Sequence, residues 1–268
     1  MSLRESSKLE EEELIQLSRS LREAISLANW RKASALVLGT LALVAILTPG
    51  TALRADTKQK QTHAKAAPAI VAPVKAYGSK NAPITMEIFT DYQCPTCGAF
   101  FEQTLRPLIN DYVASGKVYV IHRDFPLQMH QYSGQAARWA NAAGEIGQFE
   151  SVEAALYDNQ AAWTASGDLE KYVSGALSAN DFKRVQKLME GCTQPGPVAS
   201  PNRGIALSPH PCAVDAFIVQ DLTLGNQLPV TGTPTFVISS KGQRLPAGSG
   251  LVTWAILKKF FDSLLAQQ

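Results

Sequence analysis

A cysteine pair at the junction of a predicted strand and a predicted helix constrains this chain more than any other feature. A β-leaning apolar run covers residues 84–90, and Cys94-Pro95-Thr96-Cys97 follows it closely. Over residues 98–114, apolar side chains recur at three- and four-residue steps, the period of an amphipathic helix. Pro95 falls where the first helical residue would be, a position that tolerates its missing N–H. Cys94 is therefore predicted at the N-terminus of this helix.

The predicted position of Cys94 determines its chemistry. Unpaired N–H groups and the helix dipole stabilise an anion at a helix N-terminus, and a thiolate is such an anion. This setting lowers a cysteine pKa from about 8.5 to roughly 3.5–7.5 and makes it the attacking or leaving sulfur in disulfide exchange. Cys97, one turn later, is placed to close or reopen a disulfide with Cys94. Thr96 offers a hydroxyl but no positive charge, so it should stabilise the thiolate less than a histidine would.

A second motif lies far downstream, where Thr233-Pro234 opens a β-branched strand. Proline cannot donate to a strand ladder, so it favours an edge or a turn. Here the chain resembles the thioredoxin-fold oxidoreductases, in which a cis-proline lies beside the Cys-x-x-Cys. The closest resemblance is to the DsbA-like exported thiol–disulfide oxidoreductases, over roughly residues 76–265. The matching segments are Asn81-Ala82-Pro83-Ile84-Thr85, Phe89-Thr90-Asp91-Tyr92-Gln93-Cys94-Pro95, Arg123-Asp124-Phe125-Pro126-Leu127 and Gly232-Thr233-Pro234-Thr235-Phe236.

The order of predicted elements fits an α/β thioredoxin fold. The strand at 84–90, the helix behind the cysteines, which Pro107 should kink, and a strand at 118–121 predict a right-handed βαβ unit with parallel strands. The resemblance implies a helical domain inserted at about 131–226. Its predicted helices cover 136–146, 149–157, 169–177, 181–189 and 213–224. A hairpin, at 235–239 and 242–246, and an amphipathic helix at 251–265 close the predicted fold.

The first seventy or so residues lie outside the resemblance. Residues 1–32 predict a polar helical segment near a membrane surface, with weak self-association as the alternative. Residues 33–53 carry no charge and are long enough to cross about 30 Å of hydrocarbon. We therefore predict a single transmembrane helix there, with signal cleavage after Ala52 as the alternative. Residues 54–76, rich in Lys, Gln, Ala and Pro, predict a flexible linker to a catalytic domain at 77–268.

Location and partners follow mainly from the resemblance. Within fifteen residues, four Lys or Arg precede the predicted span and four follow it, so the positive-inside rule does not orient it. Members of the resembled family work outside the cytoplasm, which implies a catalytic domain outside the cytoplasmic membrane, or free in the periplasm after cleavage. Expected partners are cysteine-containing client proteins and a redox partner for the dithiol. The net charge of +2 gives no reason to expect nucleic acid, and no cofactor is expected.

Two further cysteines, Cys192 and Cys212, flank a Gly-, Pro- and Ser-rich loop at 195–211 that departs from the family pattern. In an exported protein, a disulfide closing such a loop could stabilise by roughly 3 kcal/mol, and we predict this bond. Free thiols, or a second redox pair that exchanges with the first, are the alternatives. A zinc site from all four cysteines has the right ligand count, but the sequence context of the Cys-x-x-Cys argues against it, so no metal is predicted.

The other polar residues near the motif are given ordinary roles. Asp91 is predicted as a solvated carboxylate at the strand end, with a tuning role at the active-site rim as the alternative. Thioredoxin relatives carry a buried acid about six residues before the first cysteine. Ile88 occupies that position here, and Glu87 points to the other face by strand alternation, which argues against an internal proton relay of that kind. His122 and His130 are predicted to be neither metal ligands nor acid–base groups.

The function predicted from these features is an extracytoplasmic thiol–disulfide oxidoreductase. Cys94 would exchange with client cysteines, Cys97 would resolve the mixed disulfide, and the backbone around Thr233 and Pro234 would offer an edge to an extended client peptide. Oxidase activity is favoured by the resemblance, and a reductase of the same fold is the alternative. A non-catalytic binding or assembly module with structural or zinc-bound cysteines is the alternative from a different class.

Overall fold

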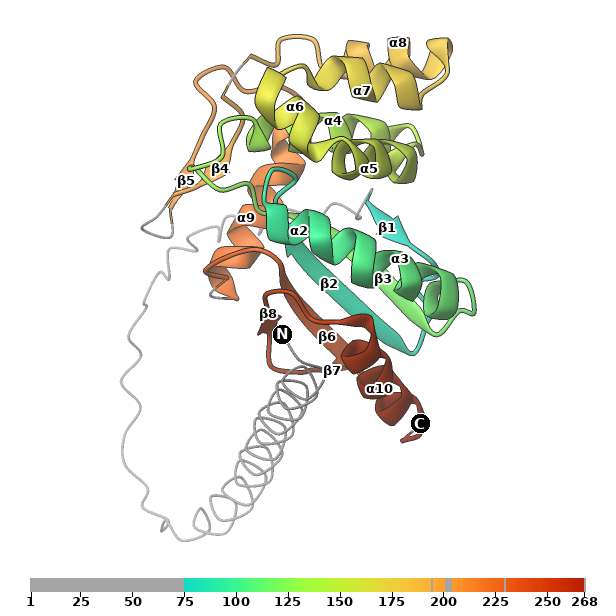
Figure 1. Ribbon diagram of the computed structural model, residues 1–268. Coiled ribbons are helices and arrows are strands. Elements are labelled where there is room, and N and C mark those ends of the chain that lie inside the picture. The colour runs from blue at the N-terminus through green and yellow to red at the C-terminus, as the bar shows by residue number, and fades with distance from the viewer. Residues whose placement is uncertain (1–74, 194, 201–203, 229, 268) are drawn as a thin grey trace, which may run out of the picture. The chain divides into compact units, whose positions relative to one another are not determined.

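The computed structural model describes residues 75–267 except 194, 201–203 and 229 (Figure 1). The segments predicted at 1–32 and 33–53, and most of the predicted linker, lie outside these residues. Residues 72–268 form one compact unit. Within the described part of this unit, no helix is both long and apolar enough to cross a membrane. The predicted linker at 54–76 ends earlier than expected, because Lys75 is 2% exposed and a strand begins at Ala76.

A mixed β-sheet with the strand order β1-β3-β2-β6-β7 lies at the centre, and β8 also pairs with β6. β2 and β3 are parallel, which confirms the predicted βαβ pairing, whereas β6 is antiparallel to β2 and forms a hairpin with β7. β3 extends three residues beyond its predicted end at 121. The strands are β1 (Ala76–Tyr77), β2 (Ile84–Thr90), β3 (Val118–Asp124), β6 (Thr235–Ser240), β7 (Gln243–Arg244) and β8 (Gly248–Ser249).

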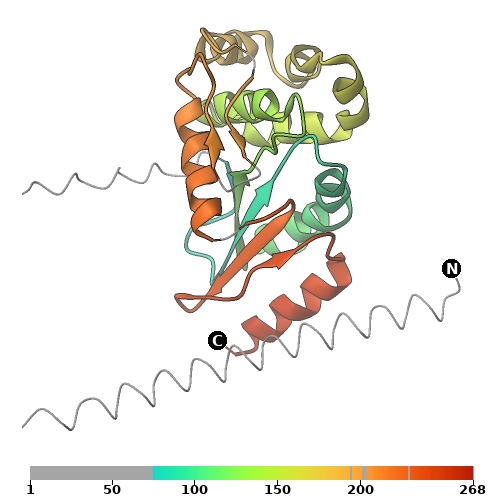
Figure 2. The same cartoon turned by 90° about the vertical axis from the view of Figure 1, so that its left-hand side faces the viewer.

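Helices cover both faces of the sheet, so the central strand β2 is buried on both sides. Met86, Ile88 and Phe89 are each at most 1% exposed. Figure 2 shows α9 (Asp215–Gln227) on one face, and the helix that follows the cysteine pair with α10 (Trp254–Leu265) on the other. The cysteine pair follows the C-terminal end of β2, so this framework determines where the pair lies.

The helix behind the cysteines is continuous from Pro95 to Val113 but contains two π-helical segments. It consists of α2 (Pro95–Phe100), the π-helical η1 (Phe101–Leu105), α3 (Arg106–Leu108) and the π-helical η2 (Ile109–Val113). The N–H of Arg106 donates to the carbonyl of Phe101, and that of Ala114 to Ile109, five residues back in each case. π-Helical turns of this kind are rare. Pro107, which lacks an N–H, lies between these two π-helical segments. The sequence predicted a kink at Pro107 but not the π-helical turns.

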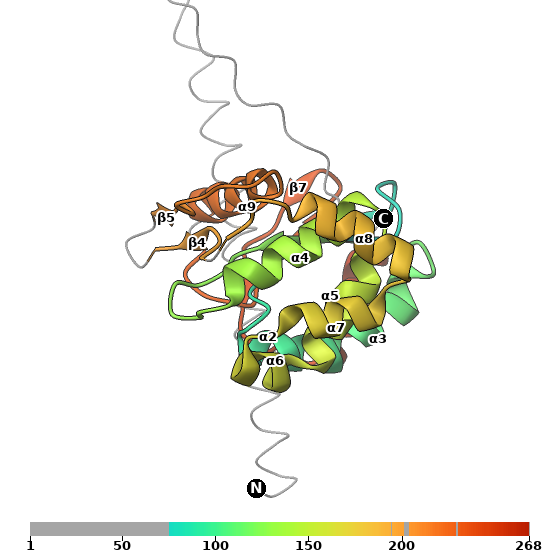
Figure 3. The same cartoon turned by 90° about the horizontal axis from the view of Figure 1, so that it is seen from above.

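The inserted helices gather beyond the end of the sheet at which β2 terminates (Figure 1, Figure 3). They are α4 (Ser133–Glu145), α5 (Phe149–Asp158), α6 (Gln160–Ser166), α7 (Leu169–Ala176) and α8 (Ala179–Leu188). The sequence did not predict α6, which is short and ends at Gly167 in the left-handed conformation. Trp163 in α6 is nevertheless completely buried, so this helix is part of the core of the insertion.

The predicted insertion at about 131–226 includes a last helix that packs on the sheet and not with the inserted helices alone. Its last helix, α9, contacts β3 and covers a face of the sheet, and its Ile218 and Leu222 are completely buried. This helix therefore belongs to the α/β framework. A buried ion pair connects it to the insertion, because Arg138 of α4 donates to both carboxylate oxygens of Asp215 at 2.6 and 2.8 Å.

A disulfide between Cys192 and Cys212 closes the loop that precedes α9. The loop holds a small antiparallel pair of strands, β4 (Val198–Ala199) and β5 (Ile205–Ala206). It also contacts the framework, since the N–H of Ala199 donates to the carbonyl of Pro126 at 2.7 Å. The disulfide thus closes a segment that lies against the chain leaving β3.

Candidate active site

The two predicted motifs meet at the C-terminal end of β2. Cys94 is the N-cap residue of α2, and its carbonyl accepts the N–H groups of Cys97 and Gly98 at 3.0 and 3.2 Å. The Thr233-Pro234 peptide bond is cis, as predicted. The Sγ of Cys94 lies 3.5 Å from the carbonyl oxygen of Thr233, across a separation of 139 residues. The dithiol and the cis-proline loop therefore belong to one site.

The two thiols differ in exposure and in acidity. Both are free, and Cys94 is 8% exposed whereas Cys97 is 1% exposed. The hydrogen bond from the Cys97 thiol lowers the pKa of Cys94 to about 5, although burial acts in the opposite direction. Thr233 and the N–H groups of Cys97 and Thr96 lower it further. Burial raises the pKa of Cys97 well above its usual value, as do its hydrogen bond with Cys94 and the charge of Cys94. At neutral pH the pair is therefore a thiolate at Cys94 beside a thiol at Cys97.

The side chain of Thr233 has a role that its position before the cis-proline did not predict. Its hydroxyl oxygen is buried and has no hydrogen-bond partner among the described residues. The same side chain lowers the pKa of both Cys94 and Cys97. An unpaired buried hydroxyl is costly, and here it is available as a donor to a neighbouring thiolate.

Gln160, which the sequence did not single out, connects the insertion to the cysteine turn. Its Nε2 donates to the carbonyls of Tyr92 and Cys94 at 2.7 and 2.9 Å. Space for this amide depends on Gly98, because a Cβ there would lie 2.7 Å from the Gln160 Oε1. No local pattern indicates this contact, since the two segments are 66 residues apart.

Asp91 is not the solvated carboxylate that was predicted. Its side chain is completely buried and accepts four hydrogen bonds. The N–H of Gln93 and the hydroxyl of Ser133 donate to Oδ1, and the N–H of Leu127 and Nδ1 of His130 donate to Oδ2. These donors offset the cost of removing a carboxylate from water. Asp91 therefore connects the cysteine turn to the segment that leads into the insertion.

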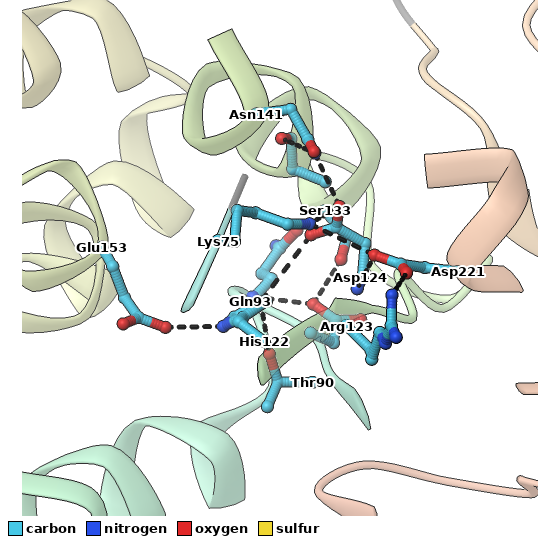
Figure 4. Close-up of polar contacts among 12 residues, drawn as sticks. Lys75, Thr90, Gln93, His122, Arg123, Asp124, Ser133, Asn141, Glu153 and Asp221 are labelled. Atoms are coloured by element: carbon cyan, nitrogen blue, oxygen red, sulfur yellow. Dashed lines mark hydrogen bonds and ion pairs between the residues drawn. The ribbon is translucent and has the colours of Figure 1, made fainter. Parts of the chain in front are cut away.

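A chain of buried ion pairs lies beside the site (Figure 4). Lys75 pairs with Asp124 and, at 3.4 Å, with Asp221. Arg123 then joins Asp221 at 3.0 Å to Glu87 at 2.7 Å. Glu87 thus has a partner away from the cysteines. These charges connect β2, β3, α9 and the residue that precedes β1.

His122 also takes part in this buried polar cluster, although it was predicted to have no special role. Its Nε2 lies 2.9 Å from the Thr90 hydroxyl and 3.7 Å from Asp124, and its Nδ1 lies 2.6 Å from Glu153 of α5. The imidazole stacks on the ring of Tyr92, with 5.0 Å between centroids. Among the described residues, no group of three or more His, Cys, Asp or Glu side chains is arranged to hold a metal ion.

These features define a class of protein: a thioredoxin-like α/β domain with a Cys-x-x-Cys at a helix N-terminus, a cis-proline beside it and an inserted helical domain. A family model described as thioredoxin matches residues 72–246, and the chain therefore belongs to the thioredoxin family. Family membership and the fold together support an oxidoreductase enzyme.

Solved DsbA structures share this fold. Wolbachia pipientis α-DsbA1 has a TM-score of 0.55 at 19% identity, over 72% of this chain and 91% of that chain. Pseudomonas aeruginosa DsbA2 has a TM-score of 0.50 at 22% identity, over 73% of this chain and 96% of that chain. These similarities confirm the predicted thioredoxin fold with its helical insertion.

Two curated relatives are much longer proteins. The Na(+)/H(+) antiporter NhaA 3 of Salinispora tropica is 26% identical over 190 residues, which are 70% of this chain and 25% of that protein. NhaA 1 of Salinispora arenicola is 33% identical over 84 residues, which are 31% of this chain and 12% of that protein. The chain thus spans a quarter or less of these relatives, and the antiporter activity in their names is not carried over to it.

Proposed function

We propose that this protein is a thiol–disulfide oxidoreductase that exchanges disulfides with cysteine-containing client proteins. The observation that carries the proposal is the unequal pair: Cys94, 8% exposed and with a pKa of about 5, lies beside the Cys97 thiol, which is 1% exposed. Thiolate character and access determine which sulfur reacts in disulfide exchange. Cys94 is therefore the sulfur that bonds to the client, and Cys97 is the resolving thiol.

Oxidation of a client dithiol takes two exchange steps. A client thiolate attacks Sγ of Cys94 in the Cys94–Cys97 disulfide, and Cys97 leaves and takes up a proton. The second client thiolate then attacks the client sulfur of the mixed disulfide, and Cys94 leaves as a thiolate. The client gains a disulfide, and its two electrons remain on the reduced Cys94–Cys97 pair. The low pKa of Cys94 favours the second step, because thiols of low pKa leave faster.

The direction of electron flow is proposed on the same ground. Stabilising the Cys94 thiolate stabilises the reduced pair, and a stabilised reduced form makes the disulfide a stronger oxidant. We therefore favour a dithiol oxidase over a reductase. A reduction potential of roughly −120 mV is expected, and roughly −270 mV would identify a reductase instead.

The proposed location is outside the cytoplasm, with residues 33–53 as the membrane anchor and periplasmic release after cleavage as the alternative. The Cys192–Cys212 disulfide supports this location, because such bonds persist in oxidising compartments. A redox partner must reoxidise the dithiol after each client. The carbonyl of Thr233, near Cys94, is part of the backbone edge offered to an extended client peptide.

A dithiol peptide that is oxidised by the disulfide form of the full chain tests the proposal. Cys94→Ser is expected to abolish exchange. Reduced Cys97→Ser, offered the disulfide form of the same peptide, should accumulate a mixed disulfide on Cys94, because no Cys97 thiolate is present to resolve it. The double variant Cys192→Ser/Cys212→Ser is the control and should still oxidise the peptide. A Cys94→Ser variant with the wild-type rate would refute the proposal and favour a non-catalytic module.

A further inference from the structure

The Cys-Pro-Thr-Cys motif brings no positive charge to its own thiolate, which directs attention to cations from other parts of the fold. His130 lies between β3 and α4, and its side chain is 20% exposed. Its Nδ1 is 2.7 Å from Oδ2 of Asp91. The side chain is thus attached to the residue that begins the cysteine turn, three positions before Cys94.

Backbone contacts hold the His130 segment against that turn. The N–H of Cys94 donates to the carbonyl of Asp91 at 3.1 Å, and the N–H of Gln93 donates to its Oδ1 at 2.7 Å. From the other side, the N–H of Tyr132 donates to Oε1 of Gln93 at 2.8 Å. Gln93 thus bonds to Asp91 through its backbone N–H and to Tyr132 through its side chain. These two hydrogen bonds keep the His130 segment next to the cysteine turn.

The carboxylate of Asp91 determines which His130 nitrogen carries a proton. Two backbone N–H groups and the Ser133 hydroxyl already donate to its two oxygens. A carboxylate acts only as an acceptor, so Nδ1 of His130 is the donor in their contact. Nε2 is then the nitrogen that gains or loses the second proton. Asp91 and Cys94 are the titratable groups that act on His130 among the described residues, and both act as negative charges.

The electrostatic interaction acts in both directions. The hydrogen bond with Asp91 raises the pKa of His130 against the opposing effect of burial, and the charges of Asp91 and Cys94 raise it further. Since coupling between two sites is reciprocal, an imidazolium that is stabilised by the Cys94 thiolate stabilises that thiolate to the same extent.

We propose that His130, held by Asp91, is a positioning residue whose imidazolium stabilises the Cys94 thiolate, so that the reduced protein holds the His130 proton more tightly than the disulfide form does. This charge comes from the β3–α4 connection, whereas the Cys-x-x-Cys itself provides none. The effect of His130 on disulfide exchange rests on the proposed function. The electrostatic coupling between His130 and Cys94 does not depend on that function, and it can be measured without a client.

The first experiment follows the His130 ring by NMR in the full chain, labelled at histidine and kept in detergent, as the pH is varied in the reduced and disulfide forms. The midpoint for His130 is expected to be higher in the reduced form by about half a unit, the size of a partly exposed charge pair. His210, in the exposed loop before α9, is the internal control and should have the same midpoint in both forms. Equal His130 midpoints would overturn the proposal, and this test needs no variant to fold.

The second experiment titrates the Cys94 thiolate by its absorbance in the His130→Gln variant, with His210→Gln as the matched control. The Cys94 midpoint should rise by about half a unit. The equilibrium with a glutathione couple should shift by about twofold to fivefold toward the disulfide. A folded His130→Gln variant with the wild-type midpoint and equilibrium would overturn the proposal. If the wild-type chain exchanged no client disulfide while the His130 coupling was present, the proposed function alone would fail.

Discussion

At the residue scale, the central feature is the difference between two cysteines of one short motif. Cys94 lies at the helix N-terminus with 8% of its surface exposed, and Cys97 is 1% exposed. The buried thiol donates to the thiolate, which lowers one pKa and raises the other. The Cys97 thiol is the largest cause of the low pKa of Cys94, whereas burial first and Cys94 second raise the pKa of Cys97. Their roles in exchange follow from this asymmetry.

The acidity of Cys94 predicts how alkylation depends on pH. In the reduced protein, the rate with iodoacetamide should rise as pH climbs through about 5 and level off above it, while Cys97 stays unmodified. Because the folded pKa is depressed, the thiolate stabilises the folded reduced state above the ordinary thiol pKa of about 8.5, and this contribution is lost as pH falls through the folded pKa. The urea-denatured protein is the control, with a midpoint near about 8.5. The same midpoint in the folded protein would contradict this account.

Thr233 supplies a second prediction at this scale. Thr233→Val keeps the shape but removes the hydroxyl that has no other partner among the described residues. The pKa of Cys94 should rise by about one unit, the order of a hydrogen bond to a charged group. Thiolate absorbance against pH measures it, and Thr231→Val, two residues earlier and exposed, is the matched control. An unchanged midpoint in Thr233→Val would show that the hydroxyl does not contact the thiolate.

At the scale of elements, connections between distant segments support the cysteine turn. Gln160 of α6 donates to the carbonyls of Tyr92 and Cys94, while Asp91 accepts from Ser133 of α4. The insertion is therefore part of the site, since two of its helices bond directly to the turn that carries Cys94. The loop before α9 is held separately by its own disulfide.

Removing that disulfide tests whether it is structural. Cys192→Ser/Cys212→Ser should lower the free energy of unfolding by roughly 3 kcal/mol, because the unfolded chain regains the freedom of a loop of about twenty residues. Urea unfolding measures the change, and the Cys94 titration of the same variant should match the wild type. Loss of peptide oxidation in a folded variant would instead identify a second redox pair.

At the scale of the whole molecule, buried charges connect the chain preceding the sheet to its centre. Lys75 lies just before β1 and is paired with Asp124 at the end of β3 and Asp221 in α9. All three residues are at most 4% exposed. The catalytic unit therefore includes the residue before its first strand, although the sequence of that segment is typical of a linker.

Lys75→Met is expected to destabilise the protein by about 3–5 kcal/mol, since two buried carboxylates would face each other without their shared cation. Thermal or urea unfolding measures the loss. Lys80→Met removes an exposed lysine five residues away and should change stability by less than about 0.5 kcal/mol. Equal effects of the two substitutions would mean that the buried pairing contributes little.

Much of the fold could be predicted because its signals are local. The strand before Cys94, the helix behind it and the closing hairpin follow from periodicity and turn residues. The parallel pairing of β2 with β3 follows from the strand–helix–strand order. The short α6 was missed because seven residues offer too little periodicity. Helix α9 was predicted but assigned to the insertion, since its burial against β3 is not visible in its own pattern.

The sequence by itself determined the identity of the reacting groups, because a cysteine at a helix N-terminus and a proline opening a strand are defined by their immediate neighbours. Only the tertiary structure decided how those groups are tuned. Asp91 is buried, Gln160 reaches the cysteine turn and His130 stands beside the turn because hydrogen-bond donors arrive from segments 36 to 68 residues away. Such partners produce no periodic pattern in the sequence, since a hydrogen bond requires only that two groups meet after folding.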